Sequence, residues 1–153
     1  MALSVLITGA SSGIGAALAR EYDKRGARVA LLARRKDRLE KLASELKDAR
    51  AIECDITDDA SVQRAVREAL AAFGELDVVI ANAGIGVMGT VEELSIEDYR
   101  RQFETNVFGM LRTVKASIGT LKRTSGRIGL LGSVSGFLSR SNSTETIHSI
   151  GPS

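Results

Sequence analysis

The sequence has few of the residues that mark secreted or membrane-spanning proteins. Among its 153 residues there are one cysteine, one proline and no tryptophan. The single cysteine, Cys54, excludes an intramolecular disulfide and fits a reducing compartment. No apolar run reaches the ~18 residues of a membrane span, and the N-terminal stretch MALSVLITGASSG meets glycine too early for a signal peptide. We therefore expect a cytoplasmic protein without a membrane segment.

Net charge is also small. The formal charge of +2 is dispersed along the chain, which argues against a nucleic acid or a membrane surface as partner. We also expect no metal site. Hydrophobic content of 44% and charged content of 26% are ordinary for a globular chain. Cys54 lies in the apolar-flanked run AIECDI, so we interpret it as a small buried side chain and not as a reactive thiol.

Hydrophobic periods alternate along the chain between strand and helix. Short apolar runs predict strands over residues 4–8, 28–33, 51–55, 76–81 and 127–131. Helical spacing predicts helices over about residues 13–25, 39–46, 62–73 and 95–122. Such alternation requires crossover connections between parallel strands. We predict an α/β fold, a Rossmann-like doubly wound parallel sheet with helices on both faces, truncated after about five strands. Residues 1–142 are expected to form this one domain and residues 143–153 an irregular tail.

A glycine-rich turn follows the first predicted strand. The stretch TGASSGIG, Thr8 to Gly15, opens the first helix, whose free N–H groups suit a phosphate group. Gly9 and Gly13 allow the backbone to turn and approach a pyrophosphate, and Gly15 allows the helix to pack closely on the strand. The spacing G-x-x-x-G-x-G differs from the commonest dinucleotide fingerprint. A tight turn without a ligand is therefore the alternative interpretation.

The end of the second predicted strand indicates which dinucleotide would bind. An acidic residue there grips an adenosine ribose, but this sequence has Ala33-Arg34-Arg35. A carboxylate would repel a 2′-phosphate, whereas a guanidinium binds one in a fork. We predict NADP as cofactor, with NADPH preferred over NADH and Arg34 as the main contact. The alternative is that both arginines are solvated charges that open the next helix.

With these positions in place, the chain resembles the short-chain dehydrogenase/reductase family over about residues 3–137. Asp55, after the third strand, matches the family residue that holds the adenine ring. Asn82-Ala83-Gly84 matches the family's Asn-Ala-Gly, which supports the central sheet and borders the cofactor. Asn106, in TNVFG, and Ser133, in LLGSVSG, match the helix asparagine and the serine of the catalytic set.

The resemblance and the glycine turn together predict two groups of site residues. Each position alone has a structural alternative: Asn106 could bond neighbouring backbone groups, Asn82 could cap a strand, and Ser133 could belong to an ordinary turn. Taken in order, they predict catalytic roles for Ser133 and Asn106. The predicted cofactor-binding residues are Gly9, Ser11, Ser12, Gly13, Ile14, Gly15, Arg34, Asp55, Ile56, Asn82, Ala83 and Gly84.

The family's remaining catalytic pair is absent from the sequence. In the family a tyrosine transfers a proton while a hydride moves between nicotinamide and a carbonyl or alcohol carbon, and a lysine four residues later tunes the tyrosine. The only tyrosines here are Tyr22 and Tyr99, and no lysine follows Lys122. Thr146 and Ile150 stand near the expected positions. His148 has no supporting pattern as an alternative donor.

Three hypotheses follow from this pattern. The chain is a shortened form of an NADP-dependent oxidoreductase acting on a small carbonyl or alcohol substrate, a nucleotide-binding module without catalysis, or a non-functional fragment. We expect no carbonyl reduction by these 153 residues. We also expect a homo-oligomer or self-association, because the long helix presents a broad apolar face. That face comprises Phe103, Val107, Met110, Leu111, Val114, Ile118 and Leu121.

Overall fold

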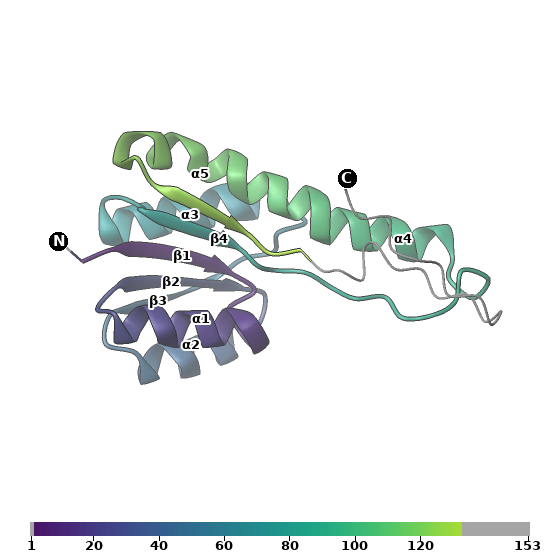
Figure 1. Ribbon diagram of the computed structural model, residues 1–153, viewed down its shortest axis with the longest axis horizontal. Coiled ribbons are helices and arrows are strands. Elements are labelled where there is room, and N and C mark those ends of the chain that lie inside the picture. Colours follow the sequence, from purple (N-terminus) through teal and green to yellow (C-terminus); the bar gives the residue numbers. More distant parts are fainter. Residues whose placement is uncertain (1, 133–153) are drawn as a thin grey trace, which may run out of the picture.

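The computed structural model describes residues 2–132, which form a parallel sheet with helices on both faces (Figure 1). The strand order across the sheet is β3-β2-β1-β4-β5, and every neighbouring pair is parallel. This arrangement confirms the predicted Rossmann-like α/β fold. The strands are β1 (Ser4–Thr8), β2 (Arg28–Ala33), β3 (Ala49–Glu53), β4 (Val78–Ala81) and β5 (Arg127–Leu130).

Helices connect each strand to the next. Three of them are single α-helices, and the long helix before β5 consists of two α-helices joined by a π-helical segment. In Figure 1, α1 and α2 lie on one side of the sheet and α3 and α5 on the other. The elements are α1 (Gly13–Lys24), α2 (Lys36–Glu45), α3 (Asp59–Phe73), α4 (Ile96–Phe103), η1 (Glu104–Gly109) and α5 (Met110–Thr124).

The sheet is buried on both faces because helices cover both of them, and each strand contributes to two cores because its successive side chains point to opposite faces. Leu6 of β1 pairs with Val79 of β4, and both belong to the core shared with α3 and α5. The next pair, Ile7 and Ile80, belongs to the core shared with α1 and α2. Cys54 is 2% exposed in the first of these cores, which confirms its prediction as a small buried side chain.

The fourth strand starts later than its apolar sequence predicted. The predicted range was 76–81, whereas β4 begins at Val78. Leu76 is fully buried, but its N–H donates to the Thr120 hydroxyl at 3.3 Å and its carbonyl oxygen accepts from the Thr124 hydroxyl at 2.9 Å. Because its backbone groups bond to α5, Leu76 does not join the ladder of the sheet.

The long helix differs from its prediction in two ways. The hydrophobic spacing predicted one continuous helix, but the helix changes to π-helical hydrogen bonding over η1. The apolar face was also predicted too broadly, because Leu121 is 3% exposed and packs into the sheet core. The exposed part of the face consists of Phe103, Val107, Leu111 and Ile118, together with Phe108, which the sequence analysis had not included.

The strand order defines where a ligand would bind. From β1 the chain continues to β2 on one side, while β4 lies on the other side and leads to β5. In open α/β sheets such a reversal leaves a crevice at the carboxyl ends of the central strands. Thr8 ends β1 and Ala81 ends β4, so the segments after these two residues form the candidate site.

Candidate nucleotide-binding site

The turn between β1 and α1 passes very close to the segment after β4. Gly9 has a φ of +66°, and a Cβ atom on it would lie 2.8 Å from Cα of Ala83. A Cβ atom on Gly15 would lie 2.3 Å from the Gly9 carbonyl oxygen and 2.7 Å from Nδ2 of Asn82. All three distances are well inside van der Waals contact. Only glycine allows this close packing at these two positions.

The start of α1 is open by comparison. Gly13 has a φ of +56°, and a Cβ atom on it would meet nothing within 4 Å. The N-cap residue Ser12 makes no side-chain capping hydrogen bond, and the first turn of α1 carries no acidic residue. Ile14 is 62% exposed beside this opening. The free N–H groups of the helix therefore face a space that suits an anionic group such as a phosphate.

Two polar side chains join the glycine turn to the end of β4. The Thr8 hydroxyl accepts hydrogen bonds from the N–H groups of Asn82 and Ala83 at 3.0 and 3.1 Å. In return, Nδ2 of Asn82 donates to the carbonyl oxygens of Thr8 and Gly9 at 3.0 and 3.3 Å. These four bonds fix the two segments relative to each other. Thr8 is a residue that the sequence analysis did not select, although it opens the stretch TGASSGIG.

Two arginines follow β2, and the role of Arg34 as the main contact of a 2′-phosphate stays a prediction. Nη2 of Arg35 donates to the hydroxyls of Ser11 and Ser12 at 3.1 and 3.3 Å, so this guanidinium reaches across to the glycine turn. Arg34 is exposed, and its side chain makes no hydrogen bond within residues 2–132. Its charge instead acts on Asp55, whose pKa it helps to lower. Both arginines therefore border the site, and Arg35 is the one that touches the turn.

The loop after β3 carries Asp55 and Ile56. The Asp55 carboxylate accepts from the N–H and the hydroxyl of Thr57 at 2.9 and 2.7 Å, and these two bonds hold its pKa below the ordinary value. The Asp55 N–H donates to the hydroxyl of Ser61 in the first turn of α3 at 3.1 Å. Ile56 is 8% exposed. The loop is thus closely bound to α3, with one carboxylate at its surface.

Asn106 of η1 binds the segment that follows β4. Its Oδ1 accepts from the N–H of Ile85 at 2.8 Å, and its Nδ2 donates to the carbonyl oxygen of Ile85 at 2.8 Å. A Cβ atom on Gly84 would lie 3.2 Å from Asn106 Oδ1, so the backbone passes tightly beneath the amide. The side chain does not bond its own helix, which was the structural alternative for a mid-helix asparagine.

The structure thus brings most of the residues selected from the sequence to one edge of the sheet. The glycine turn, Arg34, the Asp55–Ile56 loop and the segment 82–84 follow β1, β2, β3 and β4 in turn. Asn106 reaches the same edge from η1. Ser133, the other predicted catalytic residue, lies outside the described residues, as do Thr146, His148 and Ile150 of the tail.

Residues 2–132 contain neither a metal-ligand cluster nor a membrane-spanning helix. No group of three or more His, Cys, Asp or Glu side chains converges there in a way that could hold a metal ion. No helix in that range is both long and apolar enough to cross a bilayer. Burial raises the pKa of Cys54 to about 11, so its thiol is a poor nucleophile near neutral pH.

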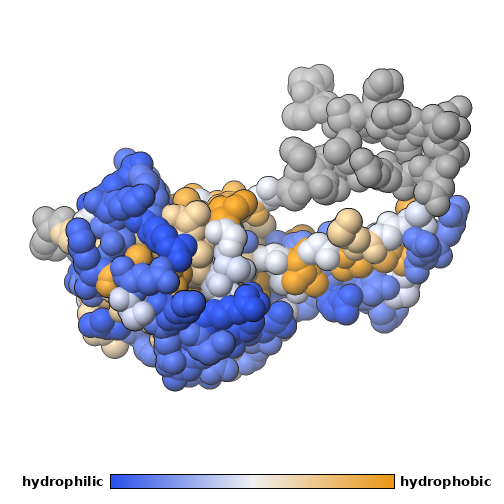
Figure 2. Space-filling view, turned by 90° about the horizontal axis from the view of Figure 1, so that it is seen from below, coloured by the Kyte–Doolittle hydropathy of each residue, from blue (hydrophilic) through white to orange (hydrophobic). Residues whose placement is uncertain are grey.

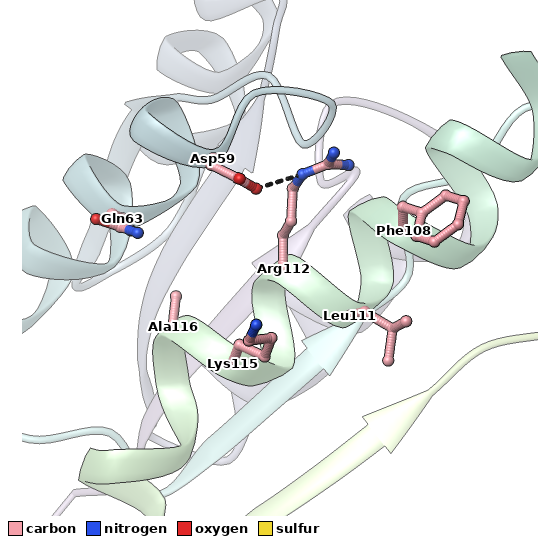
Figure 3. Close-up of a pocket in the computed structure, with 7 residues that line it drawn as sticks. All are labelled: Asp59, Gln63, Phe108, Leu111, Arg112, Lys115 and Ala116. Atoms are coloured by element: carbon pink, nitrogen blue, oxygen red, sulfur yellow. Dashed lines mark hydrogen bonds and ion pairs between the residues drawn. The ribbon is translucent and has the colours of Figure 1, made fainter.

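A separate pocket lies between α3 and the long helix (Figure 3). Its volume is about 580 Å³, and its lining includes none of the predicted catalytic or cofactor-binding residues. Arg112 of α5 points across it, with Nε 2.5 Å from Asp59 Oδ1 and Nη2 2.5 Å from Glu104 Oε1. Burial acts to lower the pKa of Arg112, but these two carboxylates outweigh burial and raise it. The ion pairs therefore connect the start of α3 to η1.

The strand order and the glycine turn define a nucleotide-binding α/β domain of the dinucleotide-binding type. Comparison with known proteins identifies the family. The family model described as short chain dehydrogenase matches residues 4–145, and the chain belongs to that family.

Curated relatives share about a third of the aligned residues. Meso-2,3-butanediol dehydrogenase of Serratia marcescens is 37% identical over 135 residues, which cover 87% of this chain and 54% of the relative. Oxidoreductase UcpA of Salmonella typhimurium is 38% identical over 138 residues, covering 87% of this chain and 52% of the relative. The chain therefore spans about half the length of these curated relatives.

Solved structures agree with the fold. An alcohol dehydrogenase from the archaeon Thermococcus sibiricus, complexed with 5-hydroxy-NADP, superposes with a TM-score of 0.81 at 41% identity, covering 84% of this chain and 57% of that one. A 3-ketoacyl-(acyl-carrier-protein) reductase from Brucella melitensis, complexed with NADH, gives a TM-score of 0.77 at 36% identity, covering 79% of this chain and 51% of that one.

Proposed function

We propose that this chain binds a nicotinamide dinucleotide at the carboxyl ends of β1 to β4, and that NADPH is preferred over NADH. The pyrophosphate lies at the start of α1, beside Gly13, and the adenine lies against Asp55 and Ile56. In the whole protein these residues form the cofactor half of an oxidoreductase that moves a hydride between the nicotinamide and a small carbonyl or alcohol substrate. The two neighbouring structures with bound dinucleotides support the cofactor class.

One observation carries the preference for NADPH. Arg35 donates to the hydroxyls of Ser11 and Ser12, and Arg34 stands beside it without a hydrogen bond among residues 2–132. Two guanidinium groups and two hydroxyls therefore border the place where a ribose 2′-phosphate would lie, and β2 ends without a carboxylate. Arginine binds phosphate through two parallel N–H donors, and a carboxylate would oppose the same group.

Binding titrations of NADPH and NADH test this proposal. Arg34→Asp and Arg35→Asp should each weaken NADPH binding by about tenfold or more, because a charge-assisted hydrogen bond contributes ~1.5–3 kcal/mol. NADH binding should change little. Arg67→Asp, an exposed residue of α3, changes the net charge equally and serves as the control. If both arginine variants kept the NADPH preference of the original chain, the assignment would be wrong.

We further propose that the 153-residue chain binds nucleotide without turning it over. Its tyrosines lie on α1 (Tyr22) and α4 (Tyr99), and no Tyr-x-x-x-Lys occurs in the sequence. A phenol tuned by a nearby lysine is the proton donor that the family's reaction requires. NADPH oxidation by the purified chain with small ketones and aldehydes should stay at background. Steady turnover would overturn this proposal, while NADPH binding without turnover would separate a binding module from a non-functional fragment.

We also propose that the chain self-associates through its long helix. Figure 2 shows apolar residues on the part of the molecule around α4 and η1, which extends beyond the sheet. Phe108 and Leu111 are 49% and 48% exposed and line the pocket beside α3. An exposed apolar face of this kind marks an interaction surface. Sedimentation should show a species larger than one chain, and Leu111→Asp should shift it toward the monomer.

We also propose a cytoplasmic location, which the single cysteine supports. Fractionation of producing cells tests this location.

A further inference from the structure

The loop after β3 packs tightly against the long helix where Ile56 meets Gly109. A Cβ atom added to Gly109 would lie 2.6 Å from Cδ1, 2.9 Å from Cγ1 and 3.2 Å from Cβ of Ile56. Carbon atoms in favourable contact lie about 3.5–4.0 Å apart. The helix therefore approaches the loop as closely as it does because residue 109 has no side chain.

The Ile56 side of this contact is held in place. Rotation of the outer ethyl group of Ile56 would move Cδ1 but leave Cγ1 in place, and a β-branched side chain is stiff at its first torsion. The loop itself is bound to α3, through the bond from Asp55 N–H to Ser61 and the capping of α3 by Asp58. A displacement at the contact would thus be taken up mainly by the helix, at η1.

The same π-helical segment carries Asn106. Gly109 and Asn106 both lie in η1, three residues apart, so a shift of Gly109 moves the backbone from which the Asn106 side chain projects. The hydroxyl of Thr113 donates to the Gly109 carbonyl oxygen at 3.0 Å, which joins this segment to α5. The two 2.8 Å bonds between Asn106 and Ile85 depend on that backbone position.

We propose that Gly109 is a positioning residue. Through its contact with Ile56, binding of a ligand at the adenine side of the site changes the position of the Asn106 side chain. This inference rests on the proposed nucleotide site. A ligand bound against the Asp55–Ile56 loop would alter the contact between Ile56 and Gly109. The two hydrogen bonds between Asn106 and Ile85 would change as a result. Asn106 and the adenine position would then be coupled without touching each other.

Magnetic resonance of the asparagine side-chain amides tests the coupling directly. The sequence has only three asparagines, so asparagine-selective isotope labelling of the full chain gives few signals, and Asn106→Asp identifies the pair from Asn106. The probe is adenosine 2′,5′-bisphosphate, which has the adenine and the 2′-phosphate of NADPH but no nicotinamide. We expect this probe to shift the Asn106 pair. Binding of the probe with the Asn106 pair unmoved would overturn the inference, whereas no binding of probe or NADPH would count against the nucleotide site itself.

Variants at the contact give a second test. Gly109→Ala should shift the Asn106 pair in the absence of ligand, and Ile56→Ala in the same chain should return it toward its original position by removing the two nearest carbons. Gly119→Ala is the matched control, because Gly119 lies on the same helix and a Cβ atom there would meet nothing within 4 Å. A folded Gly109→Ala chain with unchanged Asn106 signals would contradict the proposal. If Gly109→Ala does not fold, the probe experiment on the original chain decides.

Discussion

Asn106 holds the backbone of Ile85 with both ends of its amide, at 2.8 Å for each hydrogen bond. The two residues are 21 positions apart, and the amide serves Ile85 as a neighbouring strand would. The residue that the family resemblance selects as catalytic therefore also fixes the loop that follows β4. The Asn106 side chain thus has both a structural role and a proposed chemical role.

Replacement of Asn106 by alanine should destabilise the fold. The N–H and carbonyl groups of Ile85 would lose their partners in a partly buried position, which costs about 2 kcal/mol in the free energy of unfolding. Urea denaturation followed by circular dichroism measures this. Gln63→Ala, an exposed amide on α3, should change stability by less than about 0.5 kcal/mol. Equal effects of the two changes would show that the Asn106 bonds contribute nothing.

The glycine turn should not tolerate a methyl group at its packed position. In Gly15→Ala the new carbon would overlap the Gly9 carbonyl oxygen and the Asn82 amide, and the strain should cost about 3 kcal/mol and abolish nucleotide binding. Gly86→Ala is the control, since a Cβ atom there meets nothing within 4 Å. Thermal unfolding and an NADPH titration of both variants test the contrast. A Gly15→Ala chain as stable as Gly86→Ala would be inconsistent with the observed packing.

One substitution should stabilise the protein. Ser117 of α5 is fully buried, and its hydroxyl has no hydrogen-bond partner among the described residues. Ser117→Ala removes an unpaired buried polar group and adds a better helix former, so we expect a gain of about 1 kcal/mol. Thr113→Val on the same helix removes a hydroxyl that donates to Gly109 and should instead lose about 1 kcal/mol. The urea midpoint should rise for Ser117→Ala and fall for Thr113→Val. A lower midpoint for Ser117→Ala would refute the predicted stabilisation.

Stability should depend on pH through Asp55. Hydrogen bonds from Thr57 hold its pKa below the ordinary value of 3.8. Because the folded state has the lower pKa, the ionised carboxylate stabilises the fold above pH ~4, and this contribution is lost as the pH falls through the folded pKa. The difference in stability between the original chain and Asp55→Asn should therefore shrink from about pH 6 to about pH 3. Asp37→Asn, an exposed carboxylate, is the control, and a constant Asp55→Asn difference would contradict the prediction.

Much of the architecture could be predicted because it depends on local patterns. The apolar runs that became β1 and β2 match the predicted ranges, and Gly74 ends α3 as expected. The π-helical turn could not be predicted in this way. Its residues Gly109 and Asn106 contact Ile56 and Ile85, and both partners are distant in sequence. Leu121 was misplaced for the same reason, since helical spacing does not tell which face meets the sheet.

The sequence by itself determined the alternation of strands and helices, the glycine turn and the absence of an acidic residue at the end of β2. These features follow from side-chain periodicity and from backbone freedom at single residues. Only the tertiary structure decided that Arg35 reaches Ser11 and Ser12, that Thr8 bonds the segment after β4, and that Asn106 clasps Ile85. The first two contacts join segments brought together by parallel pairing of β1 with β2 and β4, and the third joins the segment after β4 to η1. In each case strand order and helix packing set the hydrogen-bond partners, because the partners are not sequence neighbours.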